Sequence, residues 1–214
     1  MDQLNHIETD VAKEIINIGL GKAADSLSFF SQQKVIIRSS ELILKNTSEA
    51  RNLSNKTGDN IHVLTTDIIG ELSGVCFLIF NEKEVNKLLK ISLPASILED
   101  EEQKLVMSDA ILKEADNIIS ASVITQFSNL LKFNIHGGIP EMEIISDDKV
   151  MPFLLSRATD SEYFLQISAQ FHTEEVDFSP EFVWFLDSKF IDGIKQFVKE
   201  ESYLDKLKEH SESK

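Results

Sequence analysis

The sequence predicts an α+β protein in which strands form an antiparallel β-sheet and helices pack on it. Segments rich in β-branched and apolar residues, bounded by turn-forming residues, indicate the strands, and capping residues ahead of apolar-periodic segments indicate the helices. The order helix, several strands, helix occurs twice, over residues about 5–92 and about 101–200 of the 214. We therefore expect one domain, residues 1–214, made of two repeats with pseudo-two-fold symmetry and ending in a short charged C-terminal tail.

Two capping patterns mark helix starts in the first repeat. Asn5 is followed three residues later by Glu8, and Asn81 by Glu84, which are the residue types and the spacing of a capping box. The segments expected in this repeat are a helix from residue 5 to about 30, strands at 34–44, 60–68 and 70–80, a helix from 81 to about 91, and a linker at 92–96.

The second repeat follows the same order. The expected segments are a helix within 101–132, strands at 133–145, 162–172 and 182–186, and a helix from about residue 187. Residues 136–140 (HGGIP) are interpreted as a tight bend between strands rather than a phosphate-binding loop, because no helix N-terminus evidently follows them. Asp147 and Asp148 are interpreted as a turn.

The tail from Lys199 mixes charges of both signs with two spaced leucines, Leu204 and Leu207. Such a pattern fits either a fraying helix end or a segment that docks on a partner. The sequence leaves both interpretations open.

The composition excludes several classes of protein. The formal net charge is −15, so we expect no nucleic-acid-binding surface. The N-terminus is polar and acidic and no apolar run is long enough to span a bilayer, so we expect a cytoplasmic protein without membrane insertion. The single cysteine, Cys76, lies in an apolar run and is expected in the core. The five histidines lack metal-ligand spacing, so we expect no metal site in this chain.

Polar and small residues line one side of the first long helix. At about 100° per residue, Asp10, Glu14, Asn17 and Gly21 fall within an arc of about 60°. The opposite side is apolar and is expected to face the sheet, so this stripe should face solvent. Gly21 would keep the stripe low, so that the backbone of another molecule can approach Glu14 and Asn17. Gly19 lies on the packing side and is expected to let the helix sit close to the sheet.

The second long helix repeats this stripe one hundred residues later. Ala110, Glu114, Asn117 and Ala121 occupy the matching positions, with Ala121 in the place of Gly21. An exposed acid and amide are by default solvated surface groups, and an acid with an asparagine three residues later is weak evidence by itself. Their recurrence on two equivalent helices is the reason to assign them a function.

The first stripe resembles the motif of the CheC, CheX and FliY family of chemotaxis phosphatases. That motif has Asp or Ser, then Glu four positions later, then Asn three later, then Pro twenty-three beyond the Asn, often in two copies. Asp10, Glu14 and Asn17 match it, and Ser40 stands where the proline is expected.

The second stripe carries another copy of the same motif. Glu114, Asn117 and Pro140 match, and Ala110 stands where Asp or Ser is expected. Neither departure affects the acid or the amide. Two full copies and the chain length resemble the CheC type more than the one-site CheX type, and FliY additionally carries a flagellar switch domain for which this sequence leaves no room. The resemblance implies a CheC-like fold with the two motif helices packed on the sheet.

The resemblance also implies an activity, the hydrolysis of an aspartyl phosphate on a CheY-like response regulator in chemotaxis or related two-component signalling. Asn17 and Asn117 would each orient the attacking water, and Glu14 and Glu114 would pair with the regulator's active-site lysine. Mg²⁺ would come with the regulator. The alternative is a non-catalytic adaptor that uses the same helices to bind a response regulator, a CheD-like deamidase or flagellar switch components. Ala110 and Ser40, the two departures from the motif, keep this alternative open, because a degraded site could still bind.

Overall fold

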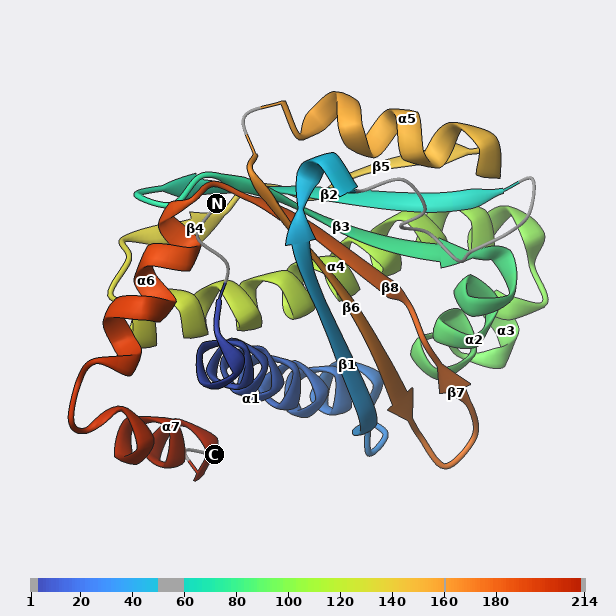
Figure 1. Ribbon diagram of the computed structural model, residues 1–214. Helices are drawn as coiled ribbons and strands as arrows, with labels where there is room; N and C mark the ends of the chain where they lie inside the picture. The colour runs from blue at the N-terminus through green and yellow to red at the C-terminus, as the bar shows by residue number, and fades with distance from the viewer. Residues whose placement is uncertain (1–3, 50–59, 160, 213–214) are drawn as a thin grey trace.

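The computed structural model describes residues 4–49, 60–159 and 161–212 of the chain (Figure 1). The helices are α1 (His6–Ser31), η1, a 3₁₀ turn (Thr47–Glu49), α2 (Glu82–Ser92), α3 (Ala95–Leu98), α4 (Glu101–Leu131), α5 (Asp147–Arg157), α6 (Lys189–Val198) and α7 (Tyr203–Glu212). The strands are β1 (Ile36–Asn46), β2 (Ile61–Gly70), β3 (Gly74–Asn81), β4 (Ile135–Gly137), β5 (Glu141–Ile145), β6 (Tyr163–His172), β7 (Asp177–Phe178) and β8 (Glu181–Leu186).

The strands form one antiparallel sheet in the order β1-β6-β8-β3-β2-β4, with β5 also paired to β2 and β7 to β6. The predicted α+β class and antiparallel sheet are therefore confirmed. Strands of the two halves interleave: β1 pairs with β6 of the second half, and β4 and β5 pair with β2 of the first. A two-fold repeat would produce this order, with β3 and β8 at its centre, and the duplication itself stays a prediction.

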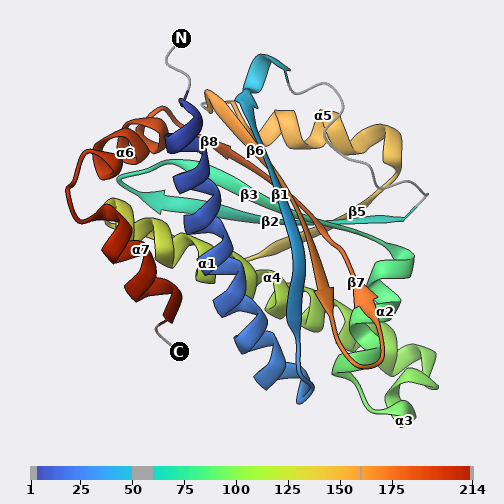
Figure 2. The ribbon, with the colours of Figure 1, turned by 60° about the horizontal axis from the view of Figure 1, so that its bottom comes forward.

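The two long helices cover one face of the sheet and α5 covers the other (Figures 1 and 2). Strand β8 shows both layers, because all six of its residues are buried. Phe182 and Trp184 join the main core under α1 and α4, whereas Val183 and Phe185 join a second cluster under α5. A strand buried on both faces reads as a continuous apolar run, as FVWFL does in the sequence. The expected packing of both long helices on the sheet is confirmed.

Both predicted helix caps form, one of them only in part. The Asn5 side chain accepts from the Glu8 N–H at 3.0 Å, and the Glu8 carboxylate accepts from the Asn5 N–H at 2.8 Å, which completes a capping box. The Asn81 side chain accepts from the Glu84 N–H at 3.0 Å. The Glu84 carboxylate accepts instead from the backbone N–H of Ser179, so it ties α2 to the segment that precedes β8.

Helix α5 corrects one prediction. Asp147 and Asp148 are not a turn, because they form the first turn of α5, where acidic side chains favour the positive end of the helix dipole. Val150 and Leu154 are buried against the sheet. Pro152 lies within this helix. In the sequence, a proline inside so short a segment indicates that the segment is not helical. Burial of the apolar side outweighs that local preference.

The C-terminal tail is not the fraying helix end that was one of its two interpretations. Helix α6 ends at Val198, and Tyr203–Glu212 forms a separate helix, α7, rather than a frayed end. Leu207 of α7 is buried in the main core cluster. The tail therefore belongs to the folded body.

Gly19 has a different role from the one predicted. A Cβ at this position would lie 2.7 Å from Cα of Val123 and 2.9 Å from its Cγ2. The close neighbour is thus helix α4 and not the sheet. Glycine at position 19 lets the two long helices touch backbone to backbone.

Candidate functional site

The first ridge lies on the outer side of α1, and we define it as Asp10, Glu14, Asn17 and Gly21. Asp10, Glu14 and Gly21 are exposed and Asn17 is half-buried, as the helical phase predicts. Asp10 Oδ2 lies 2.9 Å from Nδ1 of His6, four residues earlier. This end of the first ridge is therefore polar.

A hollow of about 380 Å³ lies over the middle of the first ridge. Glu14, Asn17 and Gly21 line it from α1, while its other walls come from the start of β1 and from His210 and Ser211 of α7. A Cβ at Gly21 would meet nothing within 4 Å. The described residues therefore give no packing reason for glycine there, which agrees with the interpretation that Gly21 keeps the ridge low.

The second ridge lies on the outer side of α4, and we define it as Ala110, Glu114, Asn117 and Ala121. All four residues are exposed. Glu114 borders a wide hollow whose other walls come mainly from the end of α1, including Phe29, which is 90% exposed. Glu114 and Asn117 thus face outward from α4, as Glu14 and Asn17 do from α1. The surroundings of the second ridge are more apolar than those of the first ridge.

Pro140 and Ser40 occupy the proline position of the two motif copies, and they lie at opposite edges of the sheet. Pro140 is half-buried in the break between β4 and β5, both of which pair with β2. The predicted tight bend is wrong, because β4 and β5 run in the same direction along β2 and residues 138–140 only interrupt this edge strand. An edge strand is where a proline is tolerated. The backbone of Ser40 continues β1 opposite Ala169, after a register shift between Ile37 and Ser39. Both edge strands thus carry an irregularity near the motif position.

Asp116 is a residue that the sequence reasoning missed. It lies between Glu114 and Asn117 in the sequence but points inward and is fully buried. Its carboxylate accepts from Thr66 Oγ1 at 2.6 Å and from Ser120 Oγ at 3.1 Å. Burial raises the pKa of Asp116 to about 6, and the two hydrogen bonds offset part of this shift. The contact with Thr66 ties α4 to β2 and so fixes which side of α4 faces out. The sequence offered one signal for this residue: at the repeat offset of one hundred residues, Asp116 takes the position of Ile16, on the apolar side of the helix.

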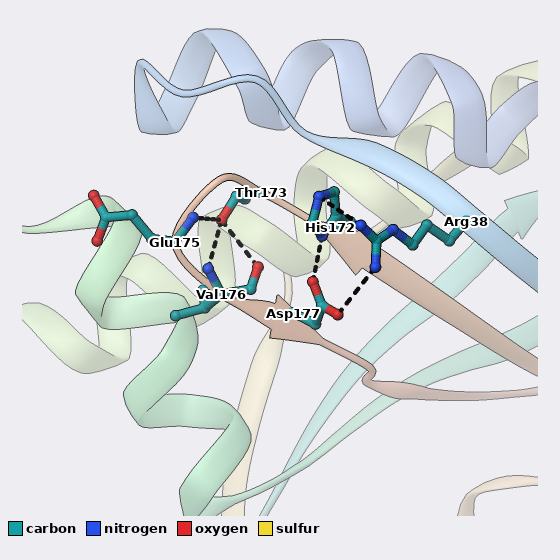
Figure 3. Close-up of polar contacts among 6 residues, drawn as sticks. All are labelled: Arg38, His172, Thr173, Glu175, Val176 and Asp177. Atoms are coloured by element: carbon teal, nitrogen blue, oxygen red, sulfur yellow. Dashed lines mark hydrogen bonds and ion pairs between the residues drawn. The ribbon is translucent and has the colours of Figure 1, made fainter.

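A second polar cluster lies at the β6–β7 hairpin (Figure 3). Arg38 donates to Nε2 of His172 at 2.8 Å, and Nδ1 of His172 contacts the Asp177 carboxylate. Because arginine only donates, Nε2 is the acceptor and Nδ1 carries the proton. The hydrogen bond with His172 lowers the pKa of Asp177, helped by the charge of Arg38. Both ring nitrogens are engaged, so His172 has no nitrogen available for acid–base chemistry.

Clusters of metal-ligating side chains and helices able to span a membrane are both absent from the residues that the structure describes. Among these residues, no group of three or more His, Cys, Asp or Glu side chains is placed to hold a metal ion. Cys76 is buried, as predicted, and burial raises the pKa of its thiol. Within the same residues, no helix combines the length and the apolar character needed to cross a membrane.

The sequence matches no family model, but the fold matches solved structures over nearly the whole chain. FliY of Thermotoga maritima is 20% identical with a TM-score of 0.69, covering 92% of this chain and 98% of that one. The FliM middle domain of H. pylori is 10% identical with a TM-score of 0.57, covering 91% and 99%. The FliM middle domain from Vibro alginolyticus is 12% identical with a TM-score of 0.55, covering 87% and 99%.

These likenesses concern the fold, and they bear on one detail of the sequence analysis. The FliY chain in that structure is covered almost completely by this chain, so length does not separate the CheC type from the FliY type. At the level of the fold, the resemblance inferred from the two motif copies is confirmed: this chain has the fold of FliY and of the FliM middle domain.

Proposed function

We propose that this chain is a chemotaxis or related two-component signalling phosphatase that hydrolyses the aspartyl phosphate of a CheY-like response regulator. One observation carries the proposal. On each of α1 and α4, a glutamate and an asparagine lie at the surface, and within each pair the two residues are about one helical turn apart. Gly21 and Ala121 leave room beside each pair. The motif resemblance and the fold shared with FliY support the proposal.

Asn17 and Asn117 are the water-orienting groups. A carboxamide does not titrate near neutral pH, so it is no general base, but it offers an acceptor oxygen and donor hydrogens at fixed positions. It holds a water in line with the bond between phosphorus and the aspartyl oxygen. The water oxygen bonds to phosphorus, the carboxylate leaves with the electron pair, and the water proton passes to a phosphate oxygen. Positioning supplies the rate gain, as it does for glutamine in small GTPases.

Glu14 and Glu114 are the anchoring groups. An exposed carboxylate one turn before the amide can pair with a lysine in the regulator's pocket and so set the register of the helix in that pocket. Mg²⁺ belongs to the regulator in this proposal, and its chemistry there is the neutralisation of phosphoryl charge. The residues of this chain bind and orient only.

A second candidate function is a non-catalytic adaptor that binds a response regulator, a CheD-like deamidase or flagellar switch components. The observation that favours it is the fold shared with two FliM middle domains. An adaptor would use the same exposed ridges for binding alone.

Loss of both amides separates the two functions. In Asn17→Ala/Asn117→Ala, the decay of a phosphorylated receiver domain should slow by about 10²–10³-fold relative to the parent protein and approach its spontaneous rate, a loss typical of removing a positioned hydrogen-bonding group. Binding of the receiver should persist, because both glutamates remain. The measurement is loss of phosphate from candidate receiver domains, with binding followed in parallel.

The matched control is Asn129→Ala, an exposed asparagine of α4 off the ridge whose backbone carbonyl, not its side chain, accepts from Lys132. It should behave as the parent protein does. Single Asn17→Ala and Asn117→Ala variants then rank the ridges, and we expect the second ridge, whose motif retains Pro140, to contribute more. Receiver binding by the parent protein without faster decay would favour the adaptor, whereas faster decay that persists in the double variant would overturn the role of the two asparagines.

A further inference from the structure

Helix α7 lies along α1 beside the first ridge (Figures 1 and 2). His210 and Ser211, near its end, line the same hollow as Glu14 and Asn17. The hollow at the second ridge is lined instead by the end of α1, the residues after it and α4. The two ridges therefore present the same acid and amide in different surroundings.

Among the described residues of α7, one side chain is buried, and the other contacts of the helix are part-buried or exposed. Leu207 is its one buried side chain among the described residues of the helix, at 7% exposure. The Tyr203 ring packs edge-on against Phe197 with ring centres 6.2 Å apart. Nδ1 of His210 lies 3.2 Å from Oε1 of buried Gln126. Segments with so few buried contacts open at low free energy, and a ten-residue helix is marginal without its packing.

The His210 contact is a weak one near neutral pH. Burial lowers the pKa of His210, and the charges of Lys22 and Lys132 lower it further. The ring is therefore neutral at pH 7, and a neutral hydrogen bond contributes only about 1 kcal/mol. Leu207 is thus the side chain that α7 buries in the apolar core, among the described residues of the helix.

We propose that α7 is a displaceable strap that regulates access to the first ridge. A protein partner of ordinary interface size covers about 800 Å², far more than the contact of two side chains. A receiver domain centred on Glu14 and Asn17 therefore meets the end of α7, and docking there requires the helix to move. The second ridge needs no such movement of α7. The identity of the docking molecule rests on the proposed function, whereas the position of α7 beside the first ridge does not.

Two matched thiol probes test the cover in the full chain. Gly21→Cys and Ala121→Cys place a thiol at equivalent exposed positions of the two ridges, and Cys76 is buried. Leu207→Ser removes the apolar side chain that α7 buries, and Leu204→Ser makes the same change at a side chain that is 55% exposed. The readout is the rate of modification by a maleimide attached to a bulky polymer.

The strap predicts a specific pattern of rates. Leu207→Ser should raise the rate at Gly21→Cys at least about five-fold and leave Ala121→Cys unchanged, while Leu204→Ser changes neither. Equal rates at Gly21→Cys with and without Leu207→Ser would overturn the proposal, as would an equal rise at both ridges. Should Leu207→Ser fail to fold, hydrogen exchange of the unmodified chain decides, because α7 must exchange at least about ten-fold faster than α1 and α4.

An activity measurement separates this inference from the proposed function. With Asn117→Ala as background, only the first ridge is active, and Leu207→Ser should speed receiver dephosphorylation several-fold whereas Leu204→Ser should not. If even the parent protein leaves receiver decay unchanged, the proposed function fails, and the thiol rates still decide whether α7 covers the ridge. Dephosphorylation through the first ridge that does not respond to Leu207→Ser would overturn the strap.

Discussion

Gly19→Ala is expected to lower the free energy of unfolding by about 1–2 kcal/mol. The added Cβ would lie 2.7 Å from Cα of Val123, and a backbone atom cannot rotate away as a side chain can. The two long helices must separate, and overpacking of this kind costs typically about 1–3 kcal/mol or more. The higher helix propensity of alanine offsets about 1 kcal/mol of that cost. Denaturant unfolding of the two proteins gives the difference directly.

Gly21→Ala is the matched control for this result. It lies two residues away on the same helix, and its added Cβ would meet nothing within 4 Å. The propensity gain is then unopposed, so the protein should become more stable by up to about 1 kcal/mol. If both substitutions stabilise the protein, the close contact between α1 and α4 does not constrain residue 19 as described.

Asp116 is expected to make the fold about 3 kcal/mol less stable at pH 7 than it would be with a neutral side chain there. Its pKa is raised from 3.8 to about 6 by burial, and each pKa unit corresponds to about 1.4 kcal/mol. The folded state holds this proton more tightly than the unfolded state does. The destabilisation is therefore absent below about pH 4, develops as the pH rises to about 6, and is constant above that.

Asp116→Asn should remove this dependence. An amide can keep both hydrogen bonds, accepting from one hydroxyl of Thr66 and Ser120 and donating to the other. The difference in unfolding free energy between variant and parent, measured from pH 4 to pH 8, should grow by about 3 kcal/mol in favour of the variant and level off above pH 6. Asp25→Asn, an exposed residue of α1, controls for the loss of one negative charge. A flat difference for Asp116→Asn would contradict the buried, ionised carboxylate.

Local signals in the sequence were sufficient for most of the fold and for the two ridges. The Asn5 box fixes where α1 starts, and from there the 100° step per residue decides that Glu14 and Asn17 face outward. The apolar runs bounded by turn-formers located the main strands within a few residues. Local pattern is informative here because the polar stripe of α1 lies opposite an apolar side, and the central strands β3 and β8 are buried apolar runs.

Contacts between distant segments account for what the sequence reasoning missed. One of the two hydrogen bonds that make Asp116 compatible with burial comes from Thr66, in a strand fifty residues away. Gly19 is explained by Val123 of another helix. Helix α5 contains Pro152 and is stabilised by a face of the sheet that no local pattern announces. None of these partners can be identified from spacing along the chain.

The interleaved sheet has a consequence for how this protein is assembled. Within the described residues, strand β1 pairs with β6 alone, so that Ile43 lies opposite Gln166, and β4 and β5 pair with β2 alone. A chain cut in the segment between α2 and α4 would give two fragments, each with an outer strand whose partner is on the other fragment. Neither fragment could complete its own sheet, and contacts of such high sequence separation slow the conformational search. The two halves must therefore fold as one cooperative unit.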